Sequence, residues 1–419
     1  MRISREHYNK IEEGLLYLIG LSLFISYDIS KILASVTILV LIGRKIFYKE
    51  SLECGNENIK KFIIGYVLIG IVWNFIGGMS YKPVRNFLKM ARYIPFLFLL
   101  YPLFQKKKEL FDRFLICGLG SYSILLGKVV LEYKKNLWRR ASGFEGVNPT
   151  GTMGAMVAVF SFGLFISERS IIKKMVYIAV YISGIWITVA TQGRAPLVGA
   201  LLGTGIIVIL ELYSNFNIKK LLLLGVAIAV LSVGGLKTIP PKKLVRFKTA
   251  FNTEKTVKNS SNGLRLEMWK IGLKRVKENP LFGAGTKYDR ENLFRKFAEE
   301  LPESSTAEKR YKNTLLTKGF NDAHSMYINA AVDMGIYIVS LLILWFLIPG
   351  YLMIKNIKRL KDKRYLLGSI GGIVVYLTVG AFWMLWRTPE QMYFWILLTT
   401  LLTTIKIDKN ESSNEKERV

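Results

Sequence analysis

Residues 175–213 read MVYIAVYISGIWITVATQGRAPLVGALLGTGIIVILELY, which is two apolar runs joined by a short polar link. The runs cover 175–190 and 196–213, and each approaches the roughly 20 residues that an α-helix needs to cross the hydrocarbon core of a bilayer. Their apolar residues fill the whole run instead of forming the single stripe of a helix on a soluble protein. This stretch therefore predicts two membrane-spanning helices with a tight turn between them.

The same pattern recurs along the chain, which has 419 residues, 51% of them hydrophobic. The runs lie near residues 11–28, 29–43, 62–79, 87–104, 111–130, 149–167, 175–190, 196–213, 221–236, 324–349, 366–386 and 391–405. The second and the last runs are the shortest. We therefore predict an all-α integral membrane protein with about 12 transmembrane helices, and not an ordinary soluble enzyme.

Lysine and arginine are concentrated in every second connection between these runs, and cytoplasmic loops are enriched in both residues. The basic connections carry Arg2, Arg5 and Lys10; Arg44, Lys45, Lys49, Lys60 and Lys61; Lys106, Lys107 and Lys108; Arg169, Lys173 and Lys174; Lys219 and Lys220; and Lys355, Lys358, Arg359, Lys361, Lys363 and Arg364. This alternation predicts that both termini are cytoplasmic.

One connection is far longer than the others and is also basic. It runs from Lys237 to Asp322 and contains 20 Lys and Arg against 10 Asp and Glu. The alternation nevertheless places it outside the cytoplasm, because loops beyond about 60 residues cross the membrane largely regardless of charge. We expect transmembrane helices 1–9 in residues 1–236, an external and mainly helical loop in 237–323, helices 10–12 in 324–405, and a disordered cytoplasmic tail in 406–419.

Several classes of protein do not fit this composition. The formal net charge of +29 sits mostly in the predicted cytoplasmic loops, where topology and anionic lipids explain it, so nucleic-acid binding is not expected. Only two cysteines are present, Cys54 and Cys117, so no metal cluster can be built from them. The chain has no phosphate-binding loop of the GxxxxGK type, which argues against an ATP-driven machine. No metal or other cofactor is expected.

A segment of the insert that begins at Asn262 has helical periodicity. Leu266, Trp269, Leu273 and Val276 recur at the spacing of an amphipathic helix lying on the membrane or on the bundle. Asn279-Pro280 ends this helix, and the Gly283-Ala284-Gly285 turn follows. Arg265 falls in the expected first turn, where the helix dipole opposes a cation unless an anion is bound; the alternative is a solvated arginine that contacts lipid headgroups.

His324 stands where the insert re-enters the membrane, and the only other histidine is His7. An imidazole at this boundary is well placed for proton transfer near neutral pH, although a lone interfacial histidine is more often structural. Asp322 is near enough in sequence to orient the ring, but spacing alone does not establish the contact.

Arg194 lies in the short link between the runs quoted above. Pro196 is tolerated in a first helical turn, so we expect Arg194 just outside the N-terminus of the next helix. There the guanidinium and the positive end of the helix dipole both favour an anion such as phosphate. The alternative is an arginine that snorkels to the interface. Other external cations that could extend a basic surface are Arg85, Arg139 and Arg140, together with Lys82, Lys134, Lys135 and Arg387.

Four segments of the sequence resemble segments of a known family. They are Gly263-Leu264-Arg265-Leu266-Glu267-Met268-Trp269, Glu278-Asn279-Pro280-Leu281-Phe282-Gly283-Ala284-Gly285, His324-Ser325-Met326-Tyr327-Ile328-Asn329 and Asp333-Met334-Gly335-Ile336. Their order and membrane placement resemble the core of the O-antigen ligase and polymerase superfamily. The Thr191–Ala195 link resembles the family's Ser-Arg-Gly segment but has Gln192-Gly193 before Arg194 and Ala195-Pro196 after it.

The resemblance implies a metal-independent glycosyltransferase that takes a glycan from undecaprenyl diphosphate at the periplasmic face of the bacterial inner membrane. In an O-antigen ligase the acceptor is a sugar of the lipid A core, and the anomeric carbon is inverted. With this chemistry in view, we expect Arg265 and Arg194 to hold the diphosphate and His324 to accept, or help polarise, the acceptor proton. Asp322, Arg139, Arg140 and Arg85 are possible supporting residues.

Two other functions stay open. A repeat-unit polymerase would use the same donor with a second lipid-linked glycan as acceptor, but such polymerases often carry two sizeable external loops, whereas this chain has one. A secondary transporter also has twelve spans, yet neither paired repeats nor broken helices with mid-membrane charges are evident. Neither the oligomeric state nor the identity of the glycan follows from the sequence.

Overall fold

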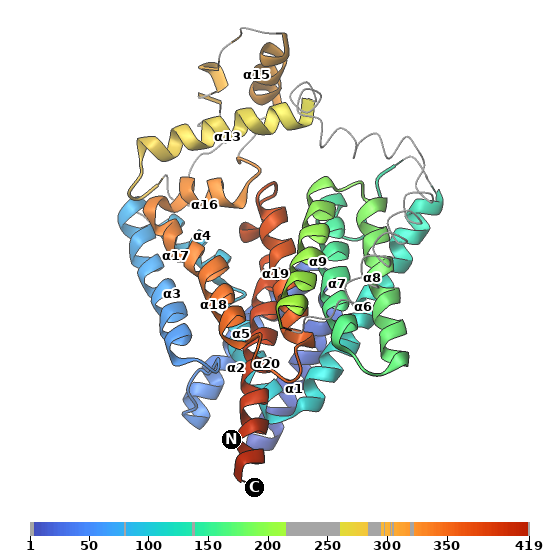
Figure 1. The fold of residues 1–419 in the computed structure, drawn as a ribbon. Helices are drawn as coiled ribbons and strands as arrows, with labels where there is room; N and C mark the ends of the chain where they lie inside the picture. Colours follow the sequence, from blue (N-terminus) through green and yellow to red (C-terminus); the bar gives the residue numbers. More distant parts are fainter. Residues whose placement is uncertain are drawn as a thin grey trace.

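The structure is a computed structural model that describes residues 4–78, 81–135, 139–214, 260–283, 295–296, 298–301, 303, 306–318 and 322–417. Within these ranges every regular element is a helix, in agreement with the all-α prediction. Figure 1 shows a bundle of long helices with two further helices, α13 and α15, across one end. Both chain termini lie at the opposite end of the bundle.

The helices follow the order of the predicted runs. They are α1 (Arg5–Ser22), α2 (Tyr27–Tyr48), α3 (Glu57–Gly78), α4 (Tyr81–Ala91), α5 (Pro95–Lys106), α6 (Lys108–Lys135), α7 (Val147–Ser167), α8 (Ile171–Ala190), α9 (Arg194–Ser214), α13 (Ser260–Glu278), α15 (Thr306–Lys318), α16 (Met326–Met334), η1 (Gly335–Tyr337), α17 (Ile338–Leu342), η2 (Ile343–Leu347), α18 (Ile348–Asn356), α19 (Arg364–Gly380), η3 (Leu385–Arg387) and α20 (Gln391–Glu417).

Seven helical segments of the described chain are long and apolar enough to cross a membrane. They are Glu57–Gly77, Pro83–Lys106, Glu109–Lys135, Val147–Ser167, Ile171–Ala190, Arg194–Ser214 and Met326–Asn356. A shorter apolar helix covers Arg364–Gly380. The protein is therefore a multi-pass membrane protein, and the count of twelve spans stays a prediction. The predicted ninth run, 221–236, lies outside the described residues, as do large parts of the insert.

The predicted boundary between the first two runs was wrong. The runs were placed at 11–28 and 29–43, whereas α1 ends at Ser22 and α2 extends from Tyr27 to Tyr48. The side chain of Ser26 caps α2 by accepting a hydrogen bond from the backbone N–H of Ile29 at 3.3 Å. Because a capping serine satisfies an N–H group at the helix start, it sets the boundary where hydropathy alone does not.

Two predicted spans are not single helices. The 87–104 run is divided into α4 and α5, with the break at residues 92–94 and Pro95 opening α5. The 324–349 run is divided at Gly335, which has a φ of +56°. Figure 1 shows α16 lying across the end of the bundle below α13, while α17 and α18 descend along it. Hydropathy reports apolar length but not such changes of direction.

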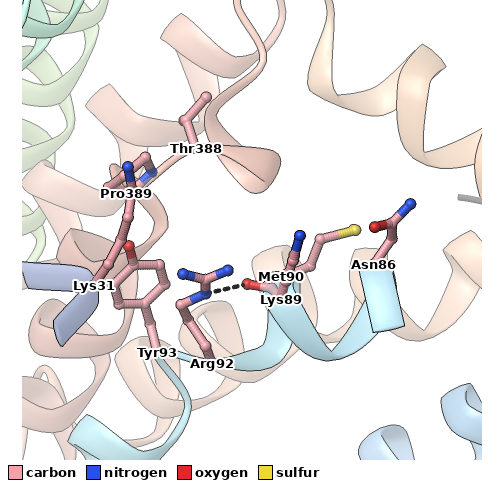
Figure 2. Close-up of a pocket in the computed structure, with 8 residues that line it drawn as sticks. All are labelled: Lys31, Asn86, Lys89, Met90, Arg92, Tyr93, Thr388 and Pro389. Carbon is pink, nitrogen blue, oxygen red and sulfur yellow. Dashed lines mark hydrogen bonds between the residues drawn. The ribbon is translucent and has the colours of Figure 1, made fainter. Parts of the chain in front are cut away.

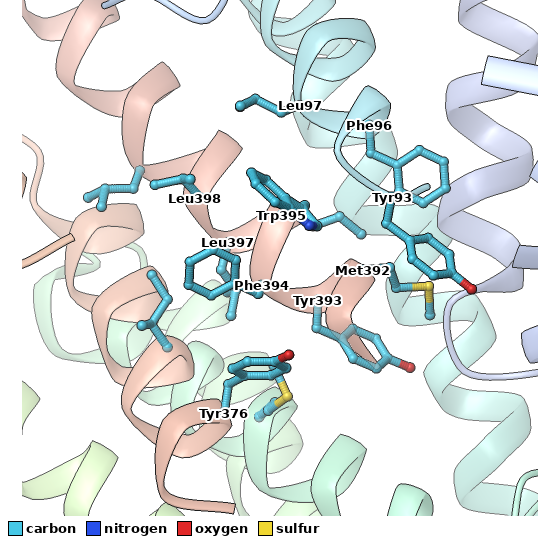
Figure 3. Packing of buried hydrophobic residues seen from close by; sticks show 14 of the residues in the cluster. Tyr93, Phe96, Leu97, Tyr376, Met392, Tyr393, Phe394, Trp395, Leu397 and Leu398 are labelled. Carbon is cyan, nitrogen blue, oxygen red and sulfur yellow. The ribbon is translucent and has the colours of Figure 1, made fainter. Parts of the chain in front are cut away.

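The end of the chain also differs from the prediction. The tail from residue 406 was expected to be disordered, but α20 continues without a break to Glu417. The N-terminal half of α20 is deeply buried, and Figure 3 shows Tyr393, Phe394 and Trp395 packed with Tyr93 and Phe96 of the α4–α5 region and with Tyr376 of α19. A helix already formed by this packing can be extended through polar residues, because each added residue avoids the cost of a new nucleus.

Glycines let α7, α8, α9 and α19 pack closely. A Cβ atom on Gly184 of α8 would lie 2.6 Å from the carbonyl oxygen of Gly154 in α7, and one on Gly203 of α9 would lie 2.8 Å from that of Gly371 in α19. Small residues of this kind permit close backbone approach between helices in a membrane. These close contacts fix the positions of the four helices relative to one another along the axis of the bundle.

The helices at the far end of the bundle form a cap. Met268 and Ile271 of α13, Leu315 of α15 and Ala323 before α16 are all buried in one apolar cluster. A Cβ atom on Gly272 of α13 would lie 2.5 Å from Ile328 of α16 and 3.2 Å from Ala323. The face of α13 that packs in the cap therefore carries Met268, Ile271 and Gly272, whereas Leu266 and Leu273 of the predicted apolar stripe are 39% and 51% exposed.

The turn after α13 meets the turn after α16, backbone against backbone. Gly283 has a φ of +70° and Gly335 one of +56°. A Cβ atom on Gly335 would lie 2.3 Å from the carbonyl oxygen of Leu281, and the N–H of Ile336 donates a hydrogen bond to that oxygen at 3.1 Å. Only glycine adopts these angles readily and leaves this space. The Gly283–Gly335 contact thus fixes one end of α13 to the end of α16.

We predict that Gly335→Ala destabilises the protein by more than about 1 kcal/mol, because alanine is strained at positive φ and would also collide with Leu281. Thermal unfolding in detergent measures the effect. Gly350→Ala in α18 is the control, because nothing lies within 4 Å of the position that the alanine methyl group would occupy and alanine favours a helix. Equal unfolding temperatures for the wild type and Gly335→Ala would contradict the role of this contact.

Candidate functional site

The residue pair Asp322 and His324 lies immediately before α16. The backbone N–H of His324 donates to Oδ1 of Asp322 at 2.5 Å, and its ring Nδ1 lies 2.6 Å from the same oxygen. Because a carboxylate accepts, Nδ1 carries the hydrogen in the neutral ring and Nε2 is left as the basic nitrogen. The carboxylate therefore orients the imidazole, a contact that the spacing alone could not establish.

A second group positions the same ring from another element. The His324 ring meets Trp383 edge to face, with 5.6 Å between ring centroids. Trp383 follows α19, and Met326 of α16 packs over Gly380 at the end of α19, where a Cβ atom would lie 2.4 Å from its sulfur. His324 has a φ of +47°, which is uncommon for a residue with a side chain. The ring is thus held at the end of α19.

Arg265 lies on the side of α13 that faces the same place. Residues 265, 269 and 272 are spaced i, i+4 and i+7, so they share one face of the helix. Trp269 packs on Phe382 with 5.9 Å between ring centroids, and Gly272 packs on Ala323. Arg265 is half-buried and is the sixth described residue of α13. Its expected position in the first turn was therefore wrong, because the helix extends further upstream than the apolar spacing indicated.

Arg194 is the first residue of α9, one position inside the helix rather than just outside it. In the antiparallel pair of α9 and α19, Gly199 packs against Val375 and Gly203 against Gly371. Extending this register by five residues brings Arg194 level with Gly380. The register thus brings the start of α9 level with Gly380, while the Trp269–Phe382 and His324–Trp383 contacts place α13 and the segment before α16 beside the residues that follow α19.

The supporting arginines are distributed unevenly around this place. Arg140 Nε donates to the carbonyl oxygen of Thr191 at 2.7 Å, and the N–H of Ala141 donates to that of Ala190 at 3.2 Å. These bonds place Arg140 beside the link that carries Arg194. Arg139 is the exposed neighbour of Arg140. Arg85 donates to the hydroxyl of Tyr81 in its own helix at 3.2 Å, a contact that does not connect it to the others.

The arrangement suits acid–base chemistry beside an anion. An imidazole oriented by a carboxylate can accept a proton through Nε2, and two guanidinium groups from different helices can hold phosphate oxygens. Arg194 adds the positive end of the α9 dipole. No group of three or more His, Cys, Asp or Glu side chains that could hold a metal ion occurs in the part of the chain that the structure describes.

Sequence reasoning missed the link between α19 and α20, which forms one wall of the site. It contributes Phe382 and Trp383 to the contacts above, and it also contains Glu390, which is only 1% exposed. Burial raises the pKa of this carboxyl group to about 7. Phe382 and Trp383 fell inside the predicted 366–386 run, so the only signal in the short connection between the runs was the lone carboxylate of Glu390.

Comparison with known proteins supports the interpretation drawn from the motifs. Residues 179–343 match a family model described as O-antigen ligase, and this segment contains Arg194, Arg265, Asp322 and His324. A protein of Haemophilus influenzae described as uncharacterized is 26% identical over 329 residues, which cover 74% of this chain and 76% of that protein.

The burial of Glu390 predicts a pH-dependent stability. The unfolded chain releases the Glu390 proton near its ordinary pKa of 4.5, whereas the folded chain keeps it until about pH 7. Rising pH across this window therefore favours the unfolded state, and the loss of stability levels off above about pH 7. Glu390→Gln should remove this loss. The free energy of unfolding of the variant should therefore exceed that of the wild type by an amount that grows by about 1 kcal/mol per pH unit between pH 5 and 7.

Thermal unfolding of both proteins in detergent at several pH values measures this difference. Glu109→Gln on the exposed surface of α6 is the control, because its carboxylate is 81% exposed. Parallel pH profiles for the wild type and Glu390→Gln would contradict the account of a buried, protonated carboxyl group.

Proposed function

Because the chain belongs to the O-antigen ligase family, we propose that it is a glycosyltransferase that completes lipopolysaccharide at the periplasmic face of the bacterial inner membrane. It moves a glycan from undecaprenyl diphosphate to a hydroxyl of a lipid A core sugar. The bond between the anomeric carbon and the diphosphate oxygen breaks as the acceptor oxygen bonds to that carbon. The acceptor proton passes to the enzyme.

The contact between Asp322 and His324 is the observation that carries this proposal. Nε2 of His324 accepts the proton of the acceptor hydroxyl, while Asp322 holds the ring in the required tautomer through Nδ1. Trp383 also contacts the ring, edge to face, and limits its rotation. A base fixed in this way raises the nucleophilicity of an otherwise weak alcohol as the bond to carbon forms.

Arg194 and Arg265 stabilise the departing diphosphate. Charge develops on its oxygens as the glycosidic bond breaks, and preorganised cations act most strongly where such charge appears. Arg140 supports this role, because its hydrogen bond to Thr191 braces the link that carries Arg194. The donor brings its own good leaving group, so the reaction needs neither a nucleotide nor a metal ion on that side of the membrane.

The arrangement of the bundle supports the proposed orientation. α13, α15 and α16 lie at one end, and both termini lie at the other (Figure 1). The lysine- and arginine-rich connections that the structure describes cluster with the termini, as cytoplasmic loops do. The site residues then face the periplasm, where a lipid-linked glycan and the lipid A core meet.

We predict that Arg265→Ala and Arg194→Ala each lower the rate of transfer by about 10² to 10³, by analogy with the loss of one charge-stabilising donor, and that His324→Ala lowers it by at least about 10². Initial rates with purified protein in detergent measure these losses. Lys277→Ala, which removes an exposed cation of α13, should leave the rate unchanged. Near-normal transfer by Arg265→Ala and His324→Ala would show that the site has been assigned wrongly.

The reaction itself is tested by incubating the purified protein with undecaprenyl-diphosphate glycan, without metal or nucleotide, and offering two acceptors separately. Glycan attached to rough lipopolysaccharide is the expected product. A ladder of longer lipid-linked glycans would instead identify a polymerase that uses the same donor. The absence of both products would contradict a glycosyltransferase and favour transport of the lipid-linked molecule.

A further inference from the structure

A separate pocket of about 260 Å³ lies between the start of α2, the break between α4 and α5, and the link from η3 to α20. Figure 2 shows Lys31, Lys89 and Arg92 around this space. The remaining lining residues are Asn86, Met90, Tyr93, Thr388 and Pro389. None of Arg194, Arg265 and His324 lines the pocket, although Thr388 and Pro389 belong to the link that also contributes Phe382 and Trp383 to the candidate site.

Two of the cations around the pocket, Lys89 and Arg92, lie in an apolar segment, where a charge costs free energy. Lys89 and Arg92 belong to the segment Pro83–Lys106, which is long and apolar enough to cross a membrane. Cations within such segments are expensive and usually serve a function. Lys89 lies in the last turn of α4, and Arg92 lies in the break that follows Ala91. The Nε of Arg92 donates to the carbonyl oxygen of Lys89 at 2.9 Å, which holds the guanidinium beside the pocket.

The positive charge of the pocket is not balanced by acidic side chains that line it. None of the eight lining residues is a carboxylate. Lys31 pairs with Asp28 at 2.6 Å, but the Asp28 side chain is 84% exposed to solvent. In the described part of the chain, neither Lys89 nor Arg92 forms an ion pair with a carboxylate. A bound anion would relieve the repulsion between these cations.

The surroundings indicate a ligand that has a hydrocarbon part. Leu88 of α4 is 44% exposed, and Ile29 and Ile32 of α2, on either side of Lys31, are 47% and 63% exposed. An acyl or prenyl chain can lie against these residues while its headgroup enters the pocket. Arginine and lysine side chains together bind phosphate oxygens well, the first through its planar fork and the second as a point charge.

We propose that this pocket binds the phosphoryl headgroup of a membrane lipid, held by Lys31, Lys89 and Arg92. The headgroup can come from a polyprenyl diphosphate carrier or from an anionic phospholipid, since both present phosphate oxygens. This inference depends on the pocket alone and stands whether or not the chain transfers glycans.

The test counts lipids bound to the full-length protein in detergent by native mass spectrometry. Undecaprenyl diphosphate, phosphatidylglycerol and zwitterionic phosphatidylcholine are titrated separately. Lys89→Gln/Arg92→Gln should lose one bound anionic lipid, with affinity falling at least about tenfold, because each cation contributes a charge-assisted hydrogen bond. Counting bound molecules separates this loss from any binding at Arg194 and Arg265.

The matched control is Lys106→Gln/Lys107→Gln, which removes two exposed cations at the C-terminal end of α5 and should leave binding unchanged. A preference of tenfold or more for undecaprenyl diphosphate over phosphatidylglycerol would identify the carrier as the ligand, and equal affinities would identify an ordinary phospholipid. Phosphatidylcholine binding as tightly as both would overturn the proposal, because it would show that the negative charge is not recognised.

Lys31→Gln keeps the test decisive if the double variant does not fold. Lys31 is a half-exposed residue at the start of α2, so its replacement should leave folding intact while weakening the binding of the anionic lipid by about threefold or more, as expected for the loss of one cation. Unchanged lipid count and affinity in this variant, or in a folded Lys89→Gln/Arg92→Gln protein, would overturn the proposal.

Discussion

The placement of the candidate site depends on how α13 is held over α16. The Gly283–Gly335 contact fixes one end of α13, and the packing of Gly272 on Ala323 and Ile328 fixes its middle. Trp73 of α3 strengthens the first contact, since its Nε1–H donates to the carbonyl oxygen of Met334 at 3.1 Å and its ring packs on Phe282. With α13 held at two points, the direction of Arg265 is set relative to His324.

Contacts among α7, α8, α9 and α19 position the other helix ends at the site. Glycines bring α7, α8, α9 and α19 into close contact, and the register between α9 and α19 carries Arg194 to the level of Gly380. The same end of α19 meets Met326, and the residues that follow it meet Trp269 and His324. Residues distant in sequence are thus brought together at one end of α19, and close packing at glycines positions that end of the helix.

The sequence predicted those features that depend on short-range chemistry. Long apolar runs correspond to membrane helices because length and composition suffice, and Asn279-Pro280 ends α13 as expected, since that helix stops at Glu278. Asp322 lies close enough to His324 that the backbone itself brings them into contact. Two of the four motifs that pointed to the family contact each other, at Gly283 and Gly335.

Other features could not be predicted because they depend on direction and on distant partners. The break between α4 and α5 and the crosswise path of α16 leave hydropathy unchanged, so the pocket at Lys89 and Arg92 and the approach of Trp383 to His324 remained hidden. The bond from Arg140 to Thr191 joins residues 51 positions apart. Such contacts arise only when the whole bundle has formed.

The most direct test of the central claim is an experimental structure of the protein in a lipid nanodisc with undecaprenyl diphosphate bound. The account predicts diphosphate density between Arg194 and Arg265, at the end of α19, with the scissile oxygen within reach of a sugar hydroxyl beside His324 Nε2. A diphosphate bound away from both arginines, or separated from His324 by the body of α13, would contradict it.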